Sequence, residues 1–442
     1  MQGKEKNRLK GKELRTFCMF SAALLFVAAF AMGNPKEILT GMWTIIYSRD
    51  ALVTDYFELA GYGAAFFNAG LMMVVGIALV EINKIPYTGI TLAALFINTG
   101  FGLWGKNIVN IIPIILGTLL YAKLHKVSFA RYVYTALFAT CLAPFVTDMV
   151  YILPFGYWIN MILAIVIGTF IGFVMPPLSA HTATMHMGYS LFNVGFSGGT
   201  LAFVMFCILK SFGIESEAVF IWKEGINPAI MMGTMLYFIT TFFWGVKLEN
   251  GNMEGLYKIM RHPGRAVADF VMMDGPGVTL MNMGLMGIVA EAYVMLIGGD
   301  LSGPILGCCL TVFGFAAFGA HLRNYVPVLV GVFLSTAFTV YTPHTPGILI
   351  ASLFVVGISP IAGQFGPIAG VFAGMLHSAI VMCTSQMYGG LNLYNNGFSA
   401  GWVAIIMIPI LESFMDRYKK RKTTTEVIKN TVEHIIKKER SE

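Results

Sequence analysis

The chain has 442 residues, of which 57% are hydrophobic and only 12% are charged, and its formal net charge is +6. Soluble domains carry about a quarter charged residues, so this composition excludes a soluble globular protein and indicates lipid as the solvent. Lys and Arg gather at the two ends of the chain. Such clusters beside apolar spans are typical of cytoplasmic anchors on anionic lipid rather than of nucleic-acid sites.

The first apolar run, residues 16–32, follows a basic leader and ends in small residues, a pattern shared with cleaved signal peptides. This run has a counterpart deep in the chain, where no signal peptidase site is expected. We therefore expect a retained membrane helix, preceded by a basic cytoplasmic N-terminus over residues 1–15.

Apolar segments that could cross about 30 Å of hydrocarbon as helices recur along the whole chain. Several are short or broken by Gly or Pro, so half-spans or re-entrant segments are open alternatives, and we expect five to seven crossings per half. The expected segments are 17–32, 63–82, 90–103, 108–121, 132–145, 159–175 and 190–209, then 229–246, 278–297, 304–318, 325–338, 347–361, 367–382 and 393–410.

The two halves are copies of one unit. A shift of 214 positions aligns residues 68–117 with 282–331 without gaps, and the match rests on Asn, Asp, Pro and Gly rather than on apolar residues. After an insertion in the first copy near residues 150–162, the shift becomes 202. There Leu-Phe-Asn-Val-Gly-Phe-Ser-Gly-Gly (191–199) meets Leu-Tyr-Asn-Asn-Gly-Phe-Ser-Ala-Gly (393–401). We assign repeat one to residues 16–212, a linker to 213–228 and repeat two to 229–414.

Basic loops alternate between the copies. The loop containing Lys123, Lys126 and Arg131 corresponds to the uncharged stretch 338–347, and the basic stretch 247–265 corresponds to a loop in which Arg49 and Asp50 balance. The positive-inside rule then predicts inverted copies, with an odd number of crossings each (seven, or else five), and both termini in the bacterial cytoplasm. Duplication in parallel orientation is the alternative. The tail, 415–442, is predicted as a basic amphipathic helix on the inner membrane surface, or else as a solvated segment.

Asparagines beside glycines stand at equivalent places inside the spans of both copies. A polar side chain in lipid must face protein or a water-filled path, and helix breaks of this kind form the substrate site between the halves of inverted-repeat transporters. Hydrogen bonding to a neighbouring helix is the structural alternative. The candidate substrate-binding residues are Asn68, Asn282, Asn110, Asn324, Asn193, Asn395, Asn392, Asn396, Ser197 and Ser399.

Glu291 is the carboxylate that lies clearly inside an apolar run, and the equivalent position of the first copy is Ile77. A desolvated carboxyl in a membrane helix is a candidate proton-coupling group. A buried structural hydrogen bond is the alternative interpretation.

Motifs of soluble enzymes are not found. Gly195-Phe196-Ser197-Gly198 matches the Gly-x-Ser-Gly pattern of intramembrane proteases, but its duplicate in the second copy indicates repeated scaffold. The histidine and cysteine spacings fit no zinc site, and there is no phosphate-binding or dinucleotide motif. We expect no metal and no cofactor.

The paired segments around Asn193 and Asn395, together with Gly-Lys-Asn-Ile-Val-Asn-Ile-Ile-Pro-Ile (105–114), resemble an uncharacterised bacterial family of internally duplicated polytopic membrane proteins, classified as a domain of unknown function. The resemblance covers the whole chain but implies no activity. Urea-transporter-like channels and nucleobase or sulfate permeases are similar in architecture only, since their specific motifs are not found.

These observations predict an all-α integral membrane protein of two repeats that acts as a secondary transporter or facilitative permease for a small polar or anionic solute. We expect the site between the repeats and no enzymatic activity. The alternatives are a membrane-embedded enzyme acting on a lipid or peptide, and a non-transporting scaffold. The expected partners are the solute and membrane lipid, not nucleic acid, and a homo-oligomer is left open.

Overall fold

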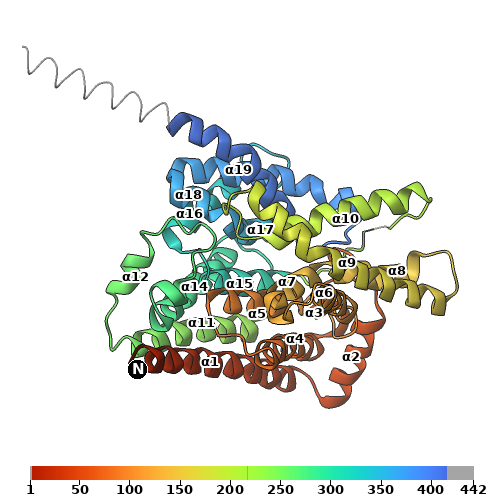
Figure 1. The fold of residues 1–442 in the computed structure, drawn as a ribbon, viewed down its shortest axis with the longest axis horizontal. Coiled ribbons are helices and arrows are strands. Elements are labelled where there is room, and N and C mark those ends of the chain that lie inside the picture. Colours follow the sequence, from red (N-terminus) through yellow and green to blue (C-terminus); the bar gives the residue numbers. More distant parts are fainter. Residues whose placement is uncertain (1, 217, 416–442) are drawn as a thin grey trace, which may run out of the picture.

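A computed structural model describes residues 2–216 and 218–415 and confirms an all-helical membrane protein (Figure 1). The predicted amphipathic tail lies almost wholly outside the described residues. The first copy contains α1 (Gln2–Met32), α2 (Pro35–Tyr47), α3 (Tyr56–Ala60), α4 (Tyr62–Ile82), α5 (Gly89–Phe101), α6 (Ile112–Leu124), α7 (Val133–Ala139), α8 (Ala143–Ile152), α9 (Tyr157–Met185) and α10 (Asn193–Ser211). The basic N-terminal residues continue α1 rather than precede it.

The second copy repeats this order, which supports the predicted duplication. It contains α11 (Pro228–Leu248), α12 (Glu254–Ile259), α13 (Phe270–Met273), α14 (Pro276–Leu296), α15 (Gly303–Phe315), α16 (Leu322–Ser335), α17 (Pro346–Phe354), α18 (Ser359–Phe365), α19 (Pro367–Thr384) and a last helix, Asn395–Met415. Among the described residues, 10 helical segments are long and apolar enough to cross a membrane, and four shorter apolar helices accompany them. In the described part of each copy, five helical segments are long enough to cross, the smaller of the two odd numbers expected, and two shorter apolar helices correspond to the half-spans left open.

The fifth segment of each copy is interrupted. A 3-10 turn, Thr140–Leu142, separates α7 from α8, and its counterpart Val355–Ile358 separates α17 from α18. Pro144 and Pro360 follow these turns at the first positions of the next helix, where the missing proline N–H leaves no helical bond unmade. The interruption is therefore part of the repeated unit.

Helix α9 is longer than predicted. The expected segment stops before Pro176 and Pro177, but the helix continues through both to Met185. Proline removes the N–H that would bond the carbonyl four residues earlier, which for Pro176 is the carbonyl of Gly172. The Thr118 hydroxyl of α6 donates to this oxygen at 2.9 Å. A neighbouring helix thus supplies the donor that the proline lacks.

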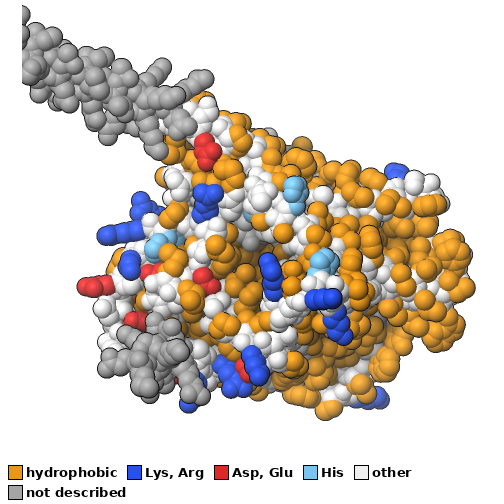
Figure 2. Space-filling view, viewed as in Figure 1, with side chains coloured by type: hydrophobic (Ala, Val, Ile, Leu, Met, Phe, Trp, Pro, Cys, Tyr) orange, Lys and Arg blue, Asp and Glu red, His pale blue; other side chains and the backbone are white. Residues whose placement is uncertain are grey.

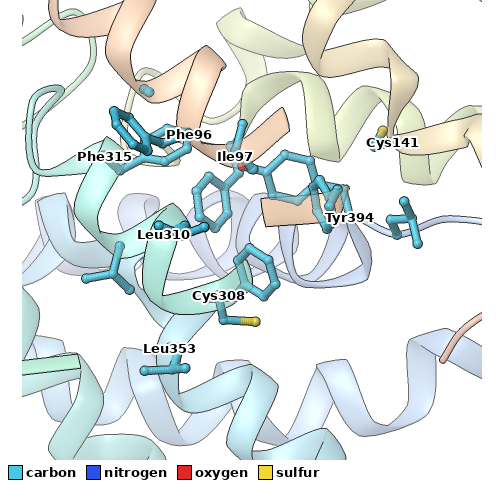
Figure 3. Packing of buried hydrophobic residues seen from close by; sticks show 14 of the residues in the cluster. Phe96, Ile97, Cys141, Cys308, Leu310, Phe315, Leu353 and Tyr394 are labelled. Carbon is cyan, nitrogen blue, oxygen red and sulfur yellow. The ribbon is translucent and has the colours of Figure 1, made fainter. Parts of the chain in front are cut away.

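The two copies meet at α5 and α15, whose residues are almost all buried. A Cβ added to Gly100 would lie 2.5 Å from the Gly307 carbonyl oxygen, and one added to Gly307 would lie 2.5 Å from that of Gly100. Further along, Gly314 approaches Ala93. The two helices therefore run antiparallel, in contacts that a two-fold rotation exchanges. Figure 3 shows the surrounding core, with Phe96 of α5 near Leu310 and Phe315 of α15.

Each copy also caps the central helix of the other. The Asp269 carboxylate accepts from the backbone N–H of Gly89 at 2.8 Å, where α5 begins. The equivalent Asp55 accepts from the N–H of Gly303 at 3.1 Å, where α15 begins. A carboxylate at a helix N-terminus satisfies a donor without an intrahelical partner and opposes the positive end of the helix dipole. The caps thus hold the two copies together reciprocally.

The equivalent long helices α1 and α11 lie side by side along the lower edge of Figure 1. The Phe17 ring contacts Trp244, and Ser21 bonds the hydroxyl of Tyr237 at 2.7 Å. Residue numbers rise along α1 as they fall along α11, so these equivalent helices are antiparallel. The copies are therefore inverted relative to each other, as predicted.

The paired asparagines Asn68 and Asn282 are buried helix clamps. The Asn68 amide donates to the carbonyls of Gly102 and Lys106 just after α5, at 2.7 and 2.6 Å. Asn282 makes the same bonds to Ala316 and Ala320 after α15. The last carbonyls of a helix have no intrahelical partner, and in lipid such groups must be bonded within the protein.

Asn110 and Asn324 likewise organise the start of α6 and of α16. Asn110 forms a reciprocal capping pair with Asn107, and Asn324 forms the same pair with His321. His321 Nε2 lies 2.8 Å from the His262 carbonyl, so Nε2 carries the proton and Nδ1 accepts from the Asn324 N–H. Burial lowers the pKa of His321 to about 4, in keeping with this neutral tautomer.

The surface reflects the lipid environment. Figure 2 shows hydrophobic side chains covering the part of the molecule that contains α8 and α9, while charged side chains gather mainly toward α12 and the N-terminus. Trp158, at the start of α9, is 71% exposed. In water such a surface would aggregate, whereas against hydrocarbon it is the expected exterior.

We predict that Gly100→Ala and Gly307→Ala each lower the melting temperature of the purified protein, because the new methyl group would collide with the backbone of the facing helix. Overpacking of this kind costs about 1–3 kcal/mol. The matched control is Gly233→Ala on α11, where an added Cβ meets open space. This change should be neutral or stabilising. Equal stability of all three variants would contradict the close packing of α5 and α15.

We further predict that His321→Asn flattens the pH dependence of stability. The folded protein resists protonation of His321 down to about pH 4, while the unfolded chain takes up this proton near its ordinary value, about 6.5. Stability is therefore lost as pH falls from about 7, by about 2 kcal/mol at pH 5. Asparagine, the residue of copy one, keeps the cap without titrating. Melting curves at pH 5 and 7 measure the difference, and an unchanged pH slope in His321→Asn would contradict the prediction.

Candidate functional site

A cavity of about 460 Å³ lies where the two copies meet. The first copy lines it with the end of α9, the following turn and the start of α10, and with residues of α5 and α7. The second copy adds the turn at Ala266 and Val267, the end of α15, and Tyr394. Its volume falls within the range of small-molecule sites, about 300–1,000 Å³.

Asn193, one of the predicted site residues, lines this cavity as the first residue of α10. Its amide nitrogen donates to the Ser179 carbonyl at 2.9 Å. Its oxygen lies 2.9 Å from both Thr182 Oγ1 and His186 Nε2. Asn193 therefore joins α10 to α9, and the orientation of its amide is set by these partners.

His186 presents an unused hydrogen-bond acceptor. Because the Asn193 oxygen faces Nε2, this nitrogen must carry the proton, and Nδ1 is left with a lone pair. Nδ1 is buried and has no partner, in a side chain that is only 2% exposed. Burial lowers the pKa of His186, which favours the neutral ring. His377 Nδ1 and the oxygens of Asn68 and Asn282 are likewise buried without a partner, but His186 differs from them in lining the cavity, where a donor could reach the residue.

The N-terminus of α10 supplies donors at the same cavity. The first N–H groups of a helix have no intrahelical partner; here they belong to Asn193, Val194 and Gly195, all of which line the cavity. The preceding residue, Phe192, makes no side-chain cap. A 19-residue helix also directs the positive end of its dipole to this point. The cavity thus combines a favourable environment for an anion with one acceptor.

The second copy repeats the hydrogen bonds that hold Asn193, here called the Asn193 clamp, but it does not repeat the open site. Asn395 is held by the Val381 carbonyl and the Thr384 hydroxyl, the counterparts of Ser179 and Thr182. The position of His186 is taken by Tyr388, whose hydroxyl bonds the Asn395 oxygen. Helix α10 and its counterpart cross at Gly195 and Gly397. A Cβ added to Gly195 would lie 3.0 Å from the Gly397 Cα. The symmetric scaffold therefore holds different side chains in its two halves.

The other nine predicted site residues do not line the cavity. Ser197 and Ser399 bond Thr182 and Thr384 inside the two clamps. Asn396 bonds His377, and Asn392 accepts from the Tyr394 N–H. Asn68, Asn282, Asn110 and Asn324 hold helix ends, as described above. Of the ten candidates, the cavity lining includes Asn193.

A buried polar cluster in the first copy is not evident from sequence. Asp50, expected to be a loop charge, is wholly buried and accepts from Tyr56, Asn110 and Thr147. Burial raises the pKa of Asp50 to about 7, against the effect of these donors. Arg49 binds buried Asp148 through two bonds of 2.8 and 2.9 Å. The equivalent of Asp50 in the second copy is Gly264, so the repeat marks only Asn110 of this cluster.

Comparison with known proteins identifies the family. The model of the family described as "Protein of unknown function (DUF1576)" matches residues 34–211 and 248–413. The chain belongs to this family. The starts of the matched ranges differ by 214 positions and their ends by 202, the two offsets of the internal repeat. No curated protein and no solved structure matches.

Proposed function

We propose that this member of the DUF1576 family is a secondary transporter or facilitative permease that moves a small polar or anionic solute across the bacterial cytoplasmic membrane. The observation that carries the proposal is the cavity between the inverted copies, which is lined by the N-terminus of α10 and by His186, whose Nδ1 has no partner. Inverted repeats that enclose a site at their interface are the architecture of many secondary transporters.

The lining favours a particular ligand chemistry. The N–H groups at a helix N-terminus bind oxyanions such as carboxylate or phosphate. The lone pair on His186 Nδ1 requires a hydrogen-bond donor on the same ligand. A small oxyanion with a hydroxyl or amino hydrogen, or a singly protonated oxyanion, provides both. A hydrophobic solute would leave the buried Nδ1 unpaired, which costs about 1–3 kcal/mol.

The surroundings of Ser197 support a non-enzymatic role. Its hydroxyl lies 2.6 Å from Thr182 Oγ1 and bonds the Asn193 carbonyl at 3.0 Å. The ring of His186 bonds Asn193 instead of Ser197. A serine nucleophile requires a base within hydrogen-bond reach, and neither of these serine contacts is such a base.

The charge pattern supports cytoplasmic termini. The basic loop 123–131 and the uncharged loop 338–347 follow the equivalent helices α6 and α16, so antiparallel copies would carry them to opposite sides of the membrane. The positive-inside rule then assigns the side of Lys123 and Arg131, and with it both termini, to the cytoplasm.

The test is a binding screen on purified protein with His186→Tyr, which installs the copy-two residue. We expect small oxyanions, for example lactate, glycerate, bicarbonate and phosphate, to raise the melting temperature of the wild type. Ligand at 100 times its dissociation constant stabilises by about 2.7 kcal/mol. The tyrosine hydroxyl should replace the bond to Asn193, so the variant stays folded but loses the shift.

The reciprocal variant Tyr388→His is the matched control, since it alters the equivalent clamp outside the cavity and should retain the ligand shift. An anion whose shift survives in His186→Tyr would place binding elsewhere and reject this site. Uptake of the stabilising anion into proteoliposomes then separates transport from binding alone. Binding without uptake would favour a sensor or scaffold.

A further inference from the structure

Glu291 is a buried acid that the proposed solute site does not use. It lies on α14 and is fully buried. Its Oε1 is 2.8 Å from Thr234 Oγ1 of α11, and its Oε2 has no partner. Within the described part of the chain, no ion pair involves Glu291. An ionised carboxylate left without a counter-charge in an apolar interior is strongly disfavoured.

The Thr234 hydroxyl can donate to Glu291 Oε1, and a protonated Glu291 would also free it to donate within its own helix. Thr234 Oγ1 lies 2.9 Å from the Ile230 carbonyl as well as 2.8 Å from Glu291 Oε1. A hydroxyl has one proton and can donate it to only one of these oxygens. Both contacts become hydrogen bonds if Thr234 donates to Ile230 and the carboxyl of Glu291 donates to Thr234. Only the protonated acid can make the second bond.

Groups on the neighbouring helices do not offset a charge at this place. The Cys309 thiol of α15 is near Glu291, and α11 contributes Tyr237, whose hydroxyl bonds Ser21. Tyr293 on the same helix bonds Ser352. The charged groups beside the start of α14, Asp274 and Lys258, pair with each other at 3.6 Å. On α1, Arg15 pairs with Glu81 at 2.8 Å.

A second cavity reaches Thr234 of this pair. It has a volume of about 310 Å³ and lies between α1 and α11, over α5 and α15. Its lining is largely apolar, with Leu24, Ala28 and Leu306 among the side chains, and it includes Gly233 and Thr234. Thr234 thus stands between the cavity and Glu291. In the first copy the equivalents of Thr234 and Glu291 are Phe20 and Ile77, so one copy only has this pair.

We infer that Glu291, with Thr234, is a proton-binding site held as the neutral acid in this conformation and reached through the apolar cavity between α1 and α11. Release of its proton to water requires that water or a cation enter this cavity to stabilise the carboxylate. Joined to the proposed transport, on which this last step rests, the site would make solute movement proton-coupled.

The test uses dicyclohexylcarbodiimide, an apolar reagent that reacts with protonated carboxyl groups in apolar surroundings. The carboxyl group adds to the carbodiimide and remains attached as an N-acylurea. On the full-length protein in lipid vesicles, peptide mass spectrometry should find the adduct on Glu291 at pH 6. Labelling should fall as pH rises. Glu81 is the matched control, because it is a membrane-helix carboxylate paired with Arg15 and should stay unlabelled. An adduct on Glu81 with none on Glu291 would overturn the inference.

Two variants complete the experiment. Glu291→Gln offers an amide N–H to Thr234 in place of the acid O–H, so it should keep the wild-type melting temperature while losing the adduct. Gly233→Phe fills the cavity and should suppress labelling of Glu291. Infrared spectra of the folded protein give an independent measurement. The difference between the wild-type and Glu291→Gln spectra at pH 7 should contain the carbonyl band of a protonated carboxylic acid, since buried Asp50 contributes equally to both spectra. A difference spectrum without this band would reject the assignment. None of these measurements involves the solute, so their failure leaves the binding test at His186 unaffected.

Discussion

The reciprocal contact between α5 and α15 is the constraint to which the other helices must conform. Asp269 caps α5, Asp55 caps α15, and Gly100 and Gly307 allow the two backbones to touch. Without side chains at the crossing, helix backbones can approach closely, which favours association where the hydrophobic effect is weak. Since the contact is exchanged by a two-fold rotation, it also dictates that every later helix of one copy runs opposite to its equivalent.

On this symmetric frame the structure separates repeated groups from unique ones. The repeated polar side chains (Asn68, Asn110, Asn193 and their counterparts) bond helix ends and neighbouring helices. The groups present in one copy alone include His186, opposite Tyr388, and Glu291, opposite Ile77. The repeated side chains therefore satisfy backbone hydrogen-bonding groups, which both copies need alike. Unused acceptors occur at both kinds of position, on His186 and Glu291 where the copies differ and on the repeated Asn68 and Asn282.

Much of the fold can be predicted from the chain because lipid imposes a simple rule. Each of the fourteen apolar segments expected from hydropathy corresponds to a helix or to a broken pair such as α7 and α8. Helix α2 is not found in this way, because its 13 residues are short and half exposed. The extension of α9 past Pro176 depends on Thr118, far away in sequence, and no local pattern contains that partner.

The candidate site is less accessible to sequence reasoning. The duplicated asparagines mark the right region, and Asn193 does line the cavity, but the same pattern marks the clamps. His186 is conspicuous only once its Nε2 is seen to be used by Asn193 and its Nδ1 is not. The burial of Asp50 depends on donors from three other segments, so its residue type alone suggests a loop. Tertiary partners, not residue types, decide these roles.

The mutual approach of Gly100 and Gly307 has a consequence for how such a protein can change over time. If the halves were identical separate chains, every substitution would be made twice, and a methyl group at this crossing would appear on both helices at once. Joined in one chain, each half can vary alone against a partner that stays constant. The pairs Gly198 and Ala400, and His186 and Tyr388, are differences of this kind. Fusion thus allows an asymmetric pathway to develop inside a frame whose central contact still requires both halves to match.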